Sequence, residues 1–181
     1  MKWSLSRWFP SRPSPATNKV KAIRRRLRLE GLEDRCVPAT VTTLSDAAVH
    51  VGVSLRDAIA ATPANGTITF QPGLSGTISL VSGELALSQN VTITGPGANV
   101  VKIDAVGASR IFDLNVASLT SKISGLTLTG GSNSFGGAIY SYSNDTLTLD
   151  HLVITGNKAS LFGGGIYNGG TLTVQIGRAH V

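Results

Sequence analysis

The sequence of 181 residues is poor in cysteine, with one, and aromatic residues make up only 6% of it. The lone cysteine, Cys36, cannot form an internal disulfide, and a zinc site built from several thiolates is excluded. Cys36 also lacks the apolar run and the small residues that precede a lipidated cysteine. We therefore interpret Cys36 as an ordinary thiol.

Long apolar runs are absent as well. No stretch approaches the roughly 18 residues that a transmembrane helix needs. The N-terminal "WSLSRWFP" is too short and too interrupted to be the apolar core of a signal peptide. We expect neither a membrane-spanning helix nor a conventional signal peptide in this chain.

Charge is concentrated at one end of the chain. Residues 1–35 hold ten Lys and Arg against three acidic residues, whereas the remainder holds six against seven. A basic segment such as "KVKAIRRRLRLE" can bind nucleic acid by releasing counterions from phosphates, but the rest of the chain offers no basic face and no ladder of stacking aromatics. We interpret residues 1–40 as a disordered basic leader that serves export, and we expect no nucleic-acid partner.

The segment "SLRDAIAAT" at 54–62 predicts a short helix. Ser54 can cap its N-terminus, and Asp57 stands three residues later, as in a capping box. Leu55 and Ile59 fall on one face at the helical period. With a strand before it, this segment forms an N-terminal unit over 41–65 that we expect to close one end of the domain that follows.

From Gly66 onward, apolar residues and threonines alternate in short runs separated by glycine, asparagine and serine, which predicts strands. Three landmarks recur in order after 26, 27 and 25 residues: LTLTG at 126–130 and LVITG at 152–156, FGGAIY at 135–140 and FGGGIY at 162–167, and TLTL at 146–149 and TLTV at 171–174. VTITG at 91–95 is similar to the first landmark. A period of this length is typical of a solenoid.

The repetition predicts which side chains stack. The two copies of a landmark should occupy the same place in consecutive coils, so that Phe135 lies over Phe162, Ile139 over Ile166 and Tyr140 over Tyr167. The side chains expected to point inward are Leu126, Leu128, Leu152 and Ile154. One coil cannot bury its inward face alone, but stacked neighbours can. The sequence predicts an all-β parallel solenoid over residues 66–174, with about four coils.

Several of these segments resemble known families. "SLRDAIAAT" followed by "GTITF" resembles the start of the CSLREA domain, with Val53 where that motif has its cysteine. "RIFDL", "ISGLTLTGG" and "GGGIYNGGTLTV" resemble the β-helical body that follows that domain, and they are similar to the GGA(I/L/V) repeats of polymorphic outer membrane proteins. The resemblance covers about residues 40–174. It implies a right-handed, single-stranded parallel β-helix of the pectate-lyase-like type in a large secreted or surface protein.

The two ends of the chain carry further resemblances. "RRRLRLEGLEDRCVPAT" is similar to an N-terminal segment of bacterial proteins predicted to be exported. "QIGRAHV" at 175–181 resembles a translated sequencing adapter. We expect the tail at 175–181 to be non-native and the coils at 66–174 to be an incomplete part of a longer protein.

A catalytic or metal site is hard to build from the sequence. Asp104 and Asp113, with Lys102 and Arg110, would form one candidate site if "VVKID" and "RIFDL" lay side by side. Two acids are too few for the calcium site of a β-helix lyase, because calcium takes six to eight oxygen ligands. "GPGANV" at 95–100 precedes a strand and not a helix, so we interpret it as a turn and not as a dinucleotide loop.

Other candidate residues have ordinary explanations. His50 and His151 are far apart in the sequence and have no evident serine or cysteine partner. The pairs Thr92/Thr94, Thr127/Thr129 and Thr146/Thr148 would form outward columns able to bind an ordered surface, but β-propensity explains threonine in strands more simply. We therefore assign no catalytic, cofactor-binding or metal-binding residue.

The sequence favours a non-enzymatic, exported or cell-surface module with a structural or adhesive function in a larger bacterial protein. We expect it to be monomeric, to lie outside the cell or on its outer surface, and to contact a polysaccharide or the surface of a host or neighbouring cell. The alternative is a carbohydrate-active β-helix, a lyase, hydrolase or polysaccharide-binding module, whose site lies in further coils.

Overall fold

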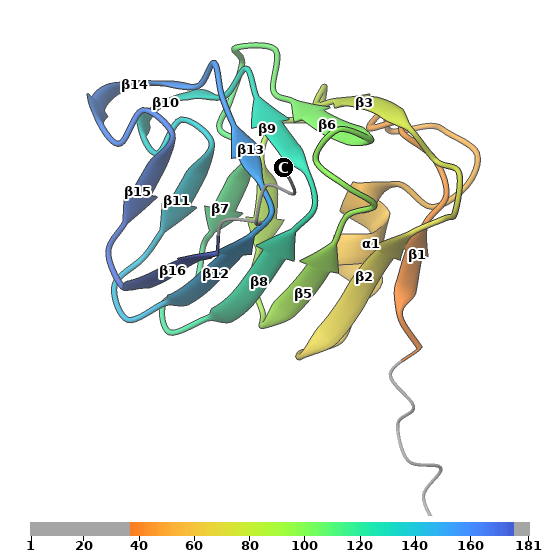
Figure 1. Ribbon diagram of the computed structural model, residues 1–181, viewed down its shortest axis with the longest axis horizontal. Coiled ribbons are helices and arrows are strands. Elements are labelled where there is room, and N and C mark those ends of the chain that lie inside the picture. Colours follow the sequence, from red (N-terminus) through yellow and green to blue (C-terminus); the bar gives the residue numbers. More distant parts are fainter. Residues whose placement is uncertain (1–36, 176–181) are drawn as a thin grey trace, which may run out of the picture. The chain divides into compact units, whose positions relative to one another are not determined.

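The computed structural model describes residues 37–175, which form an all-β parallel solenoid of about five turns with one short helix (Figure 1). Residues 1–36 and 176–181 lie outside the described part, so the predictions for the basic leader, Cys36 and the C-terminal tail stay predictions. The elements are β1 (Ala39–Val41), α1 (Leu55–Ala61), β2 (Gly66–Phe70), β3 (Gly76–Ser79), β4 (Leu85–Leu87), β5 (Val91–Thr94), β6 (Val101–Asp104), β7 (Phe112–Leu114), β8 (Thr120–Ser124), β9 (Thr127–Thr129), β10 (Ser132–Phe135), β11 (Ile139–Ser141), β12 (Thr146–Asp150), β13 (Val153–Ile154), β14 (Lys158–Phe162), β15 (Ile166–Asn168) and β16 (Thr171–Gln175).

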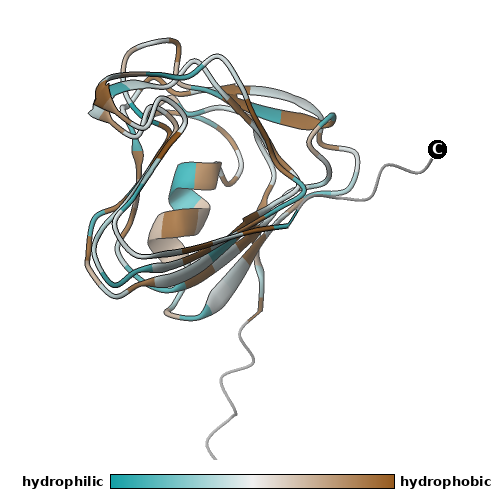
Figure 2. Ribbon diagram, turned by 60° about the vertical axis from the view of Figure 1, so that its left-hand side comes forward, coloured by the Kyte–Doolittle hydropathy of each residue, from teal (hydrophilic) through white to brown (hydrophobic). Residues whose placement is uncertain are grey.

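The strands of successive turns pair in parallel and build the walls of the solenoid. Sheet I has the order β1-β2-β5-β8-β12-β16, sheet II the order β13-β9-β6-β3, and sheet III the order β15-β11-β7-β4; β10 and β14 pair at a corner. Figure 2 looks nearly along the solenoid and shows the resulting triangular cross-section. The predicted fold class is confirmed in these respects.

The repeated landmarks occupy the same place in consecutive turns. Phe135 pairs with Phe162, Ile139 with Ile166 and Tyr140 with Tyr167. Strand β12 pairs with β16 over its whole length. The predicted stacking of the repeats is therefore confirmed.

The inward side chains form stacked columns that fill the interior. Ile68, Ile93 and Ile123 pair across sheet I and are fully buried. The predicted inward residues of sheet II behave alike: Leu126 and Leu128 are fully buried, and the equivalent residues one turn later pack against the core. Parallel strands 4.7–4.9 Å apart bring such columns into contact at every turn.

The segment at 91–95 differs from its predicted place. Strand β5 pairs with β2 and β8 in sheet I, whereas the segment at 126–130 belongs to β9 in sheet II. The similarity between the two segments misleads because an inward apolar residue alternates with an outward threonine in strands of both sheet I and sheet II. With β5 in sheet I, strands β2, β5, β8, β12 and β16 mark five turns, not four.

Helix α1 forms where the capping signals predicted it. The Ser54 hydroxyl accepts a hydrogen bond from the Asp57 backbone N–H at 3.1 Å, and the Ser54 N–H donates to the Asp57 carboxylate at 2.9 Å. Leu55 and Ala58 are buried in the same core cluster as the first coil. The helix lies across the triangular cross-section of the coils (Figure 2), and its function as a cap of the solenoid stays a prediction.

Candidate functional site

The candidate pair of Asp104 and Asp113 does not form. Strand β6 lies in sheet II and β7 in sheet III, so the two strands follow each other around one turn and are not neighbours in a sheet. Asp104 contacts Lys102, with 3.6 Å between Oδ2 and Nζ, whereas Asp113 contacts Arg110. The condition for this candidate site is therefore not met, because adjacent strands of a solenoid sheet come from successive turns, not from successive strands of the chain.

The threonine columns form only in part: Thr120, Thr146 and Thr171 pair in register in sheet I, whereas the column that contains Thr92 is interrupted. Thr92 and Thr148 lie in one column of sheet I, but Lys122 stands between them, and Lys122 and Asp150 form an ion pair at 3.0 Å on this face. Thr127 and Thr129 lie in sheet II. The segment at 95–100 is a turn between β5 and β6, as predicted.

An ionic cluster on the outer side of sheet III was not predicted from the sequence. The Arg110 Nε lies 2.9 Å from the Glu84 Oε2, and its Nη1 lies 3.6 Å from the Asp113 Oδ1. The Arg110 guanidinium carbon is also 4.7 Å from the centre of the Tyr140 ring, a cation–π contact. We call Glu84, Arg110 and Asp113 the Arg110 cluster.

Burial controls the electrostatics of this cluster. Burial raises the pKa of Asp113, and the Glu84 carboxylate raises it further, although the Arg110 charge opposes both. The Arg110 Nε and Nη1 and the Asp113 Oδ1 are buried and make no hydrogen bond of good geometry to the described residues, despite the 2.9 Å ion-pair contact. A buried ion pair with incomplete hydrogen bonding is a poor source of stability, which favours a functional explanation.

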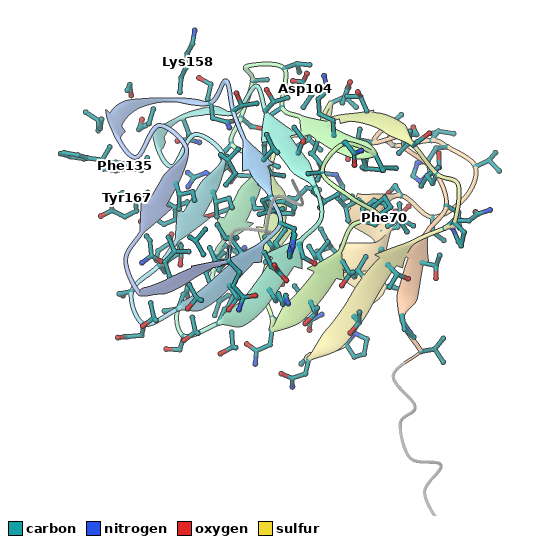
Figure 3. All side chains as sticks on the ribbon, in the orientation of Figure 1. Phe70, Asp104, Phe135, Lys158 and Tyr167 are labelled. Carbon is teal, nitrogen blue, oxygen red and sulfur yellow. The ribbon has the colours of Figure 1, made fainter. Side chains whose placement is uncertain are left out.

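Aromatic side chains continue from the cluster along the outer face. Tyr140 stacks on Tyr167 with ring centres 5.1 Å apart and planes 7° apart, and Tyr142 meets Tyr140 edge-on at 4.8 Å. Phe135 meets Tyr167 edge-on at 5.4 Å and stacks on Phe162 at 5.9 Å. We call these five residues the aromatic row; Figure 3 shows two of its members, Phe135 and Tyr167, side by side at the outer surface.

The register of sheet III explains the position of the row. Its strands β4, β7, β11 and β15 are three residues long, and the middle residue of each strand points outward: Ala86, Asp113, Tyr140 and Tyr167 are in register. Burial raises the pKa of the Tyr140 hydroxyl, and the neighbouring tyrosines add to this effect. Repetition of one outward position thus places an acid and two tyrosines in a line along the solenoid.

A hollow of about 340 Å³ lies between helix α1 and strand β4. Arg56, Ile59, Glu84, Ser88 and Gln89 contribute to its lining. Glu84 belongs both to this hollow and to the Arg110 cluster. The hollow, the cluster and the aromatic row therefore form one elongated surface.

The histidines lie apart from this surface. His151 is exposed and contacts Asp150, whereas His50 joins the cap of helix α1, with its Nε2 2.7 Å from the Asp57 Oδ2 and its Nδ1 2.6 Å from the Ala47 carbonyl. Within residues 37–175, no group of three or more His, Cys, Asp and Glu side chains is placed to hold a metal ion. None of the helices described is both long and apolar enough to cross a membrane.

The contact between His50 and Asp57 predicts that the stability of the N-terminus of helix α1 depends on pH. The Ala47 carbonyl and the Asp57 carboxylate raise the pKa of His50, and the Ser54 hydroxyl and N–H, with His50, lower the pKa of Asp57 to about 2. The contribution of His50 is thus fully present below its unfolded pKa of about 6.5 and is lost as pH rises through the higher folded value. The contribution of Asp57 is lost as pH falls from about 4 towards 2.

We expect the melting temperature of His50→Gln to lie below that of the unmodified chain at pH 5.5 and to approach it as pH rises to 8.5. Thermal unfolding followed by circular dichroism measures this difference. In an Asp57→Asn background, the same His50→Gln change should lose its pH dependence. A constant difference between pH 5.5 and 8.5 would contradict the ion pair.

The comparisons with known proteins add one finding. The model of the Chlamydia polymorphic membrane protein repeat matches residues 151–169, which include β13, β14 and β15 and two members of the aromatic row, Phe162 and Tyr167. No curated protein and no solved structure matches the chain. The repeat match and the parallel coils together suggest a bacterial surface protein built on a β-helix.

Proposed function

We propose that this chain is an exported adhesive module of a bacterial cell-surface protein, and that it presents the aromatic row and the Arg110 cluster to a partner on another surface. One observation carries the proposal. Within residues 37–175, Phe70 and Phe112 lie in the core, and every other aromatic side chain belongs to this single row. Aromatic and arginine side chains grouped on a surface are typical of binding sites.

Two further observations support the finer parts of the proposal. The matching repeat at 151–169 is named for a membrane protein, which supports a place in the cell envelope. Ser54, Arg56 and Asp57, which carry the resemblance to the CSLREA domain, make the contacts that hold the cap, and this supports an N-terminal cap of that type. We also propose that the coils of the solenoid wind in the right-handed sense, as the resemblance to the CSLREA domain and its β-helical body implies.

Adhesion of coated beads tests the proposal. Beads carrying the purified chain should adhere to layers of bacterial or epithelial cells, and Tyr142→Ser/Phe162→Ser should reduce their adhesion several-fold. Both side chains are exposed, 41% for Tyr142 and 64% for Phe162, so the fold should tolerate the changes. The matched control is Val81→Ser/Val153→Ser, which removes two exposed apolar side chains outside the row. No adhesion, or equal adhesion of the two double variants, would contradict the proposal.

A carbohydrate-active enzyme is the second candidate. It is favoured by the two carboxyl groups, Glu84 and Asp113, of which Asp113 has a raised pKa beside the aromatic row. Glycosidases use two carboxyl groups, one of them with a raised pKa as general acid. Release of new reducing ends from a polysaccharide by the unmodified chain, lost in Asp113→Asn, would favour this function over simple adhesion.

A further inference from the structure

We infer that the partner of the aromatic row is a neutral polysaccharide, bound as an extended chain along the outer surface that carries the row. This inference rests on the proposed adhesive function and names the chemical class of its ligand. It follows from the shape of the surface, from the exposure of its rings and from the balance of its charges.

The shape of the surface favours a linear ligand. Each strand of sheet III presents one outward side chain, so Asp113, Tyr140 and Tyr167 form a line one residue wide. Successive turns are spaced by about 4.8 Å, the distance between paired strands. A globular protein partner of ordinary affinity covers about 800 Å² of surface, far wider than this line. A polysaccharide chain is itself narrow and extended.

The rings of the row differ in how accessible their faces are to a ligand. Tyr140 is enclosed between the Arg110 guanidinium and the Tyr167 ring, so its faces are occupied. Tyr142 and Phe162, at the two ends of the row, are the exposed members. The inner rings thus hold the outer ones in place, and the outer rings offer apolar faces. The C–H-rich face of a pyranose ring is suited to such a face, and the sugar hydroxyls are suited to the nearby tyrosine hydroxyls.

The charges of the surface disfavour an acidic ligand. Arg110 is already paired with Glu84 and Asp113, so its positive charge is neutralised within the cluster. Lys158 of β14 points away from Phe135 and Tyr167 (Figure 3). The Glu84 carboxylate, 35% exposed, can accept hydrogen bonds from sugar hydroxyls. A neutral polymer rich in hydroxyl groups meets these donors and acceptors without electrostatic repulsion.

The hollow beside helix α1 extends the same surface. Its volume of about 340 Å³ falls within the range of small-ligand pockets, about 300–1,000 Å³. The side chains of Ser88 and Gln89 supply polar groups there, and Glu84 connects the hollow to the Arg110 cluster. A sugar unit of the bound chain fits this hollow, and the remaining units extend towards Tyr142 and Phe162.

Affinity gel electrophoresis of the full chain tests the inference. The gels contain hydroxyethyl cellulose, mannan or xyloglucan as neutral polymers, or polygalacturonate as an acidic one. We expect at least one neutral polymer to retard the chain. Tyr142→Ser/Phe162→Ser should weaken the apparent affinity about tenfold, since two stacking rings are lost, whereas Val81→Ser/Val153→Ser should leave it unchanged.

The outcomes separate this inference from the proposed function. Retardation by polygalacturonate alone, or equal retardation of the two double variants, overturns the inference. If no polymer retards the chain while bead adhesion still depends on Tyr142 and Phe162, the polysaccharide is excluded, the adhesive function stands, and the row contacts a protein. If neither retardation nor adhesion occurs, both proposals are overturned.

Discussion

Gly137→Ala is expected to destabilise the coils by about 3 kcal/mol or more, a value at the upper end of the cost of overpacking. A Cβ atom at Gly137 would lie 2.2 Å from the Gly164 carbonyl oxygen and 2.4 Å from that of Lys158. Both atoms belong to the backbone of the next turn, and the Gly137 N–H donates to the Gly163 carbonyl at 3.1 Å. Relief of the clash therefore requires separation of two paired turns.

The repeat supplies a matched control for this change. Gly164 is the equivalent residue one turn later, and a Cβ atom there would meet only the Asn157 carbonyl oxygen, at 3.7 Å. Gly164→Ala should change the free energy of unfolding by no more than about 0.5 kcal/mol. Urea unfolding of the two variants gives both values. Equal destabilisation would contradict the stacking of the FGG(A/G)IY segments as it is described for residues 37–175.

The sequence predicts the stacking of this molecule better than its surface. The pairs Phe135 with Phe162 and Tyr140 with Tyr167 could be predicted because identical residues of the repeat occupy equivalent positions in successive turns. The segment at 91–95 is similar to the one at 126–130 but lies in another sheet, because threonine alternates with apolar residues in both sheet I and sheet II. A local pattern reports that a strand has an inner and an outer side, but not which sheet it joins.

The Arg110 cluster depends on contacts that no local pattern encodes. Glu84 in "SGELAL" and Arg110 in "SRIFDL" meet because β4 and β7 pair in register, Leu85 with Phe112. The signal that could have identified the cluster is an alignment of these two segments, since each has an apolar residue, a middle residue and a leucine in the same order. For the aromatic row, the repeated FGG(A/G)IY segment predicted that its rings stack in pairs. It did not predict that all five rings lie next to one another on one surface.

Asp46→Ala is expected to destabilise the N-terminal cap by about 3 kcal/mol, because breaking a buried ion pair leaves its partner uncompensated. The Asp46 side chain is only 2% exposed, and its Oδ1 and Oδ2 lie 2.7 and 3.0 Å from the Arg56 Nε and Nη2. Oδ2 also accepts hydrogen bonds from the backbone N–H groups of Val81 and Ser82. Removal of the carboxylate leaves these donors without their acceptor.

Arg56 extends the same network from the helix to the turn that precedes strand β4 of sheet III. Its Nη1 donates to the Glu84 carbonyl at 2.8 Å, and its Nη2 donates to the Gly83 carbonyl at 2.7 Å. Arg56 thus joins three segments that are separate in the sequence: the loop that contains Asp46, helix α1, and the turn before β4. Arg56→Ala should therefore cost a similar free energy, and Asp46→Ala/Arg56→Ala should cost clearly less than the sum of the two single changes.

The pKa of Asp46 gives an independent measure of the network. Burial raises this pKa, but the hydrogen bond from Arg56 and the backbone N–H groups of Ser82 and Val81 outweigh burial and leave the pKa below its usual value. The contribution of Asp46 is thus present above the unfolded pKa of about 3.9 and is lost as pH falls through the lower folded value. The difference in melting temperature between the unmodified chain and Asp46→Ala should accordingly shrink as pH falls below about 4.

The control for this prediction is Asp150→Ala on the outer face of sheet I. Asp150 pairs with Lys122 at 3.0 Å, but Lys122 is 41% exposed and the pair lies at the surface, where ion pairs contribute little. Urea unfolding should separate the two acids, with a large loss for Asp46→Ala and a small one for Asp150→Ala. If the two losses are equal, or if the double change at Asp46 and Arg56 costs the full sum, the cap is not held by this network, and its stability comes from the burial of Leu55 and Ala58.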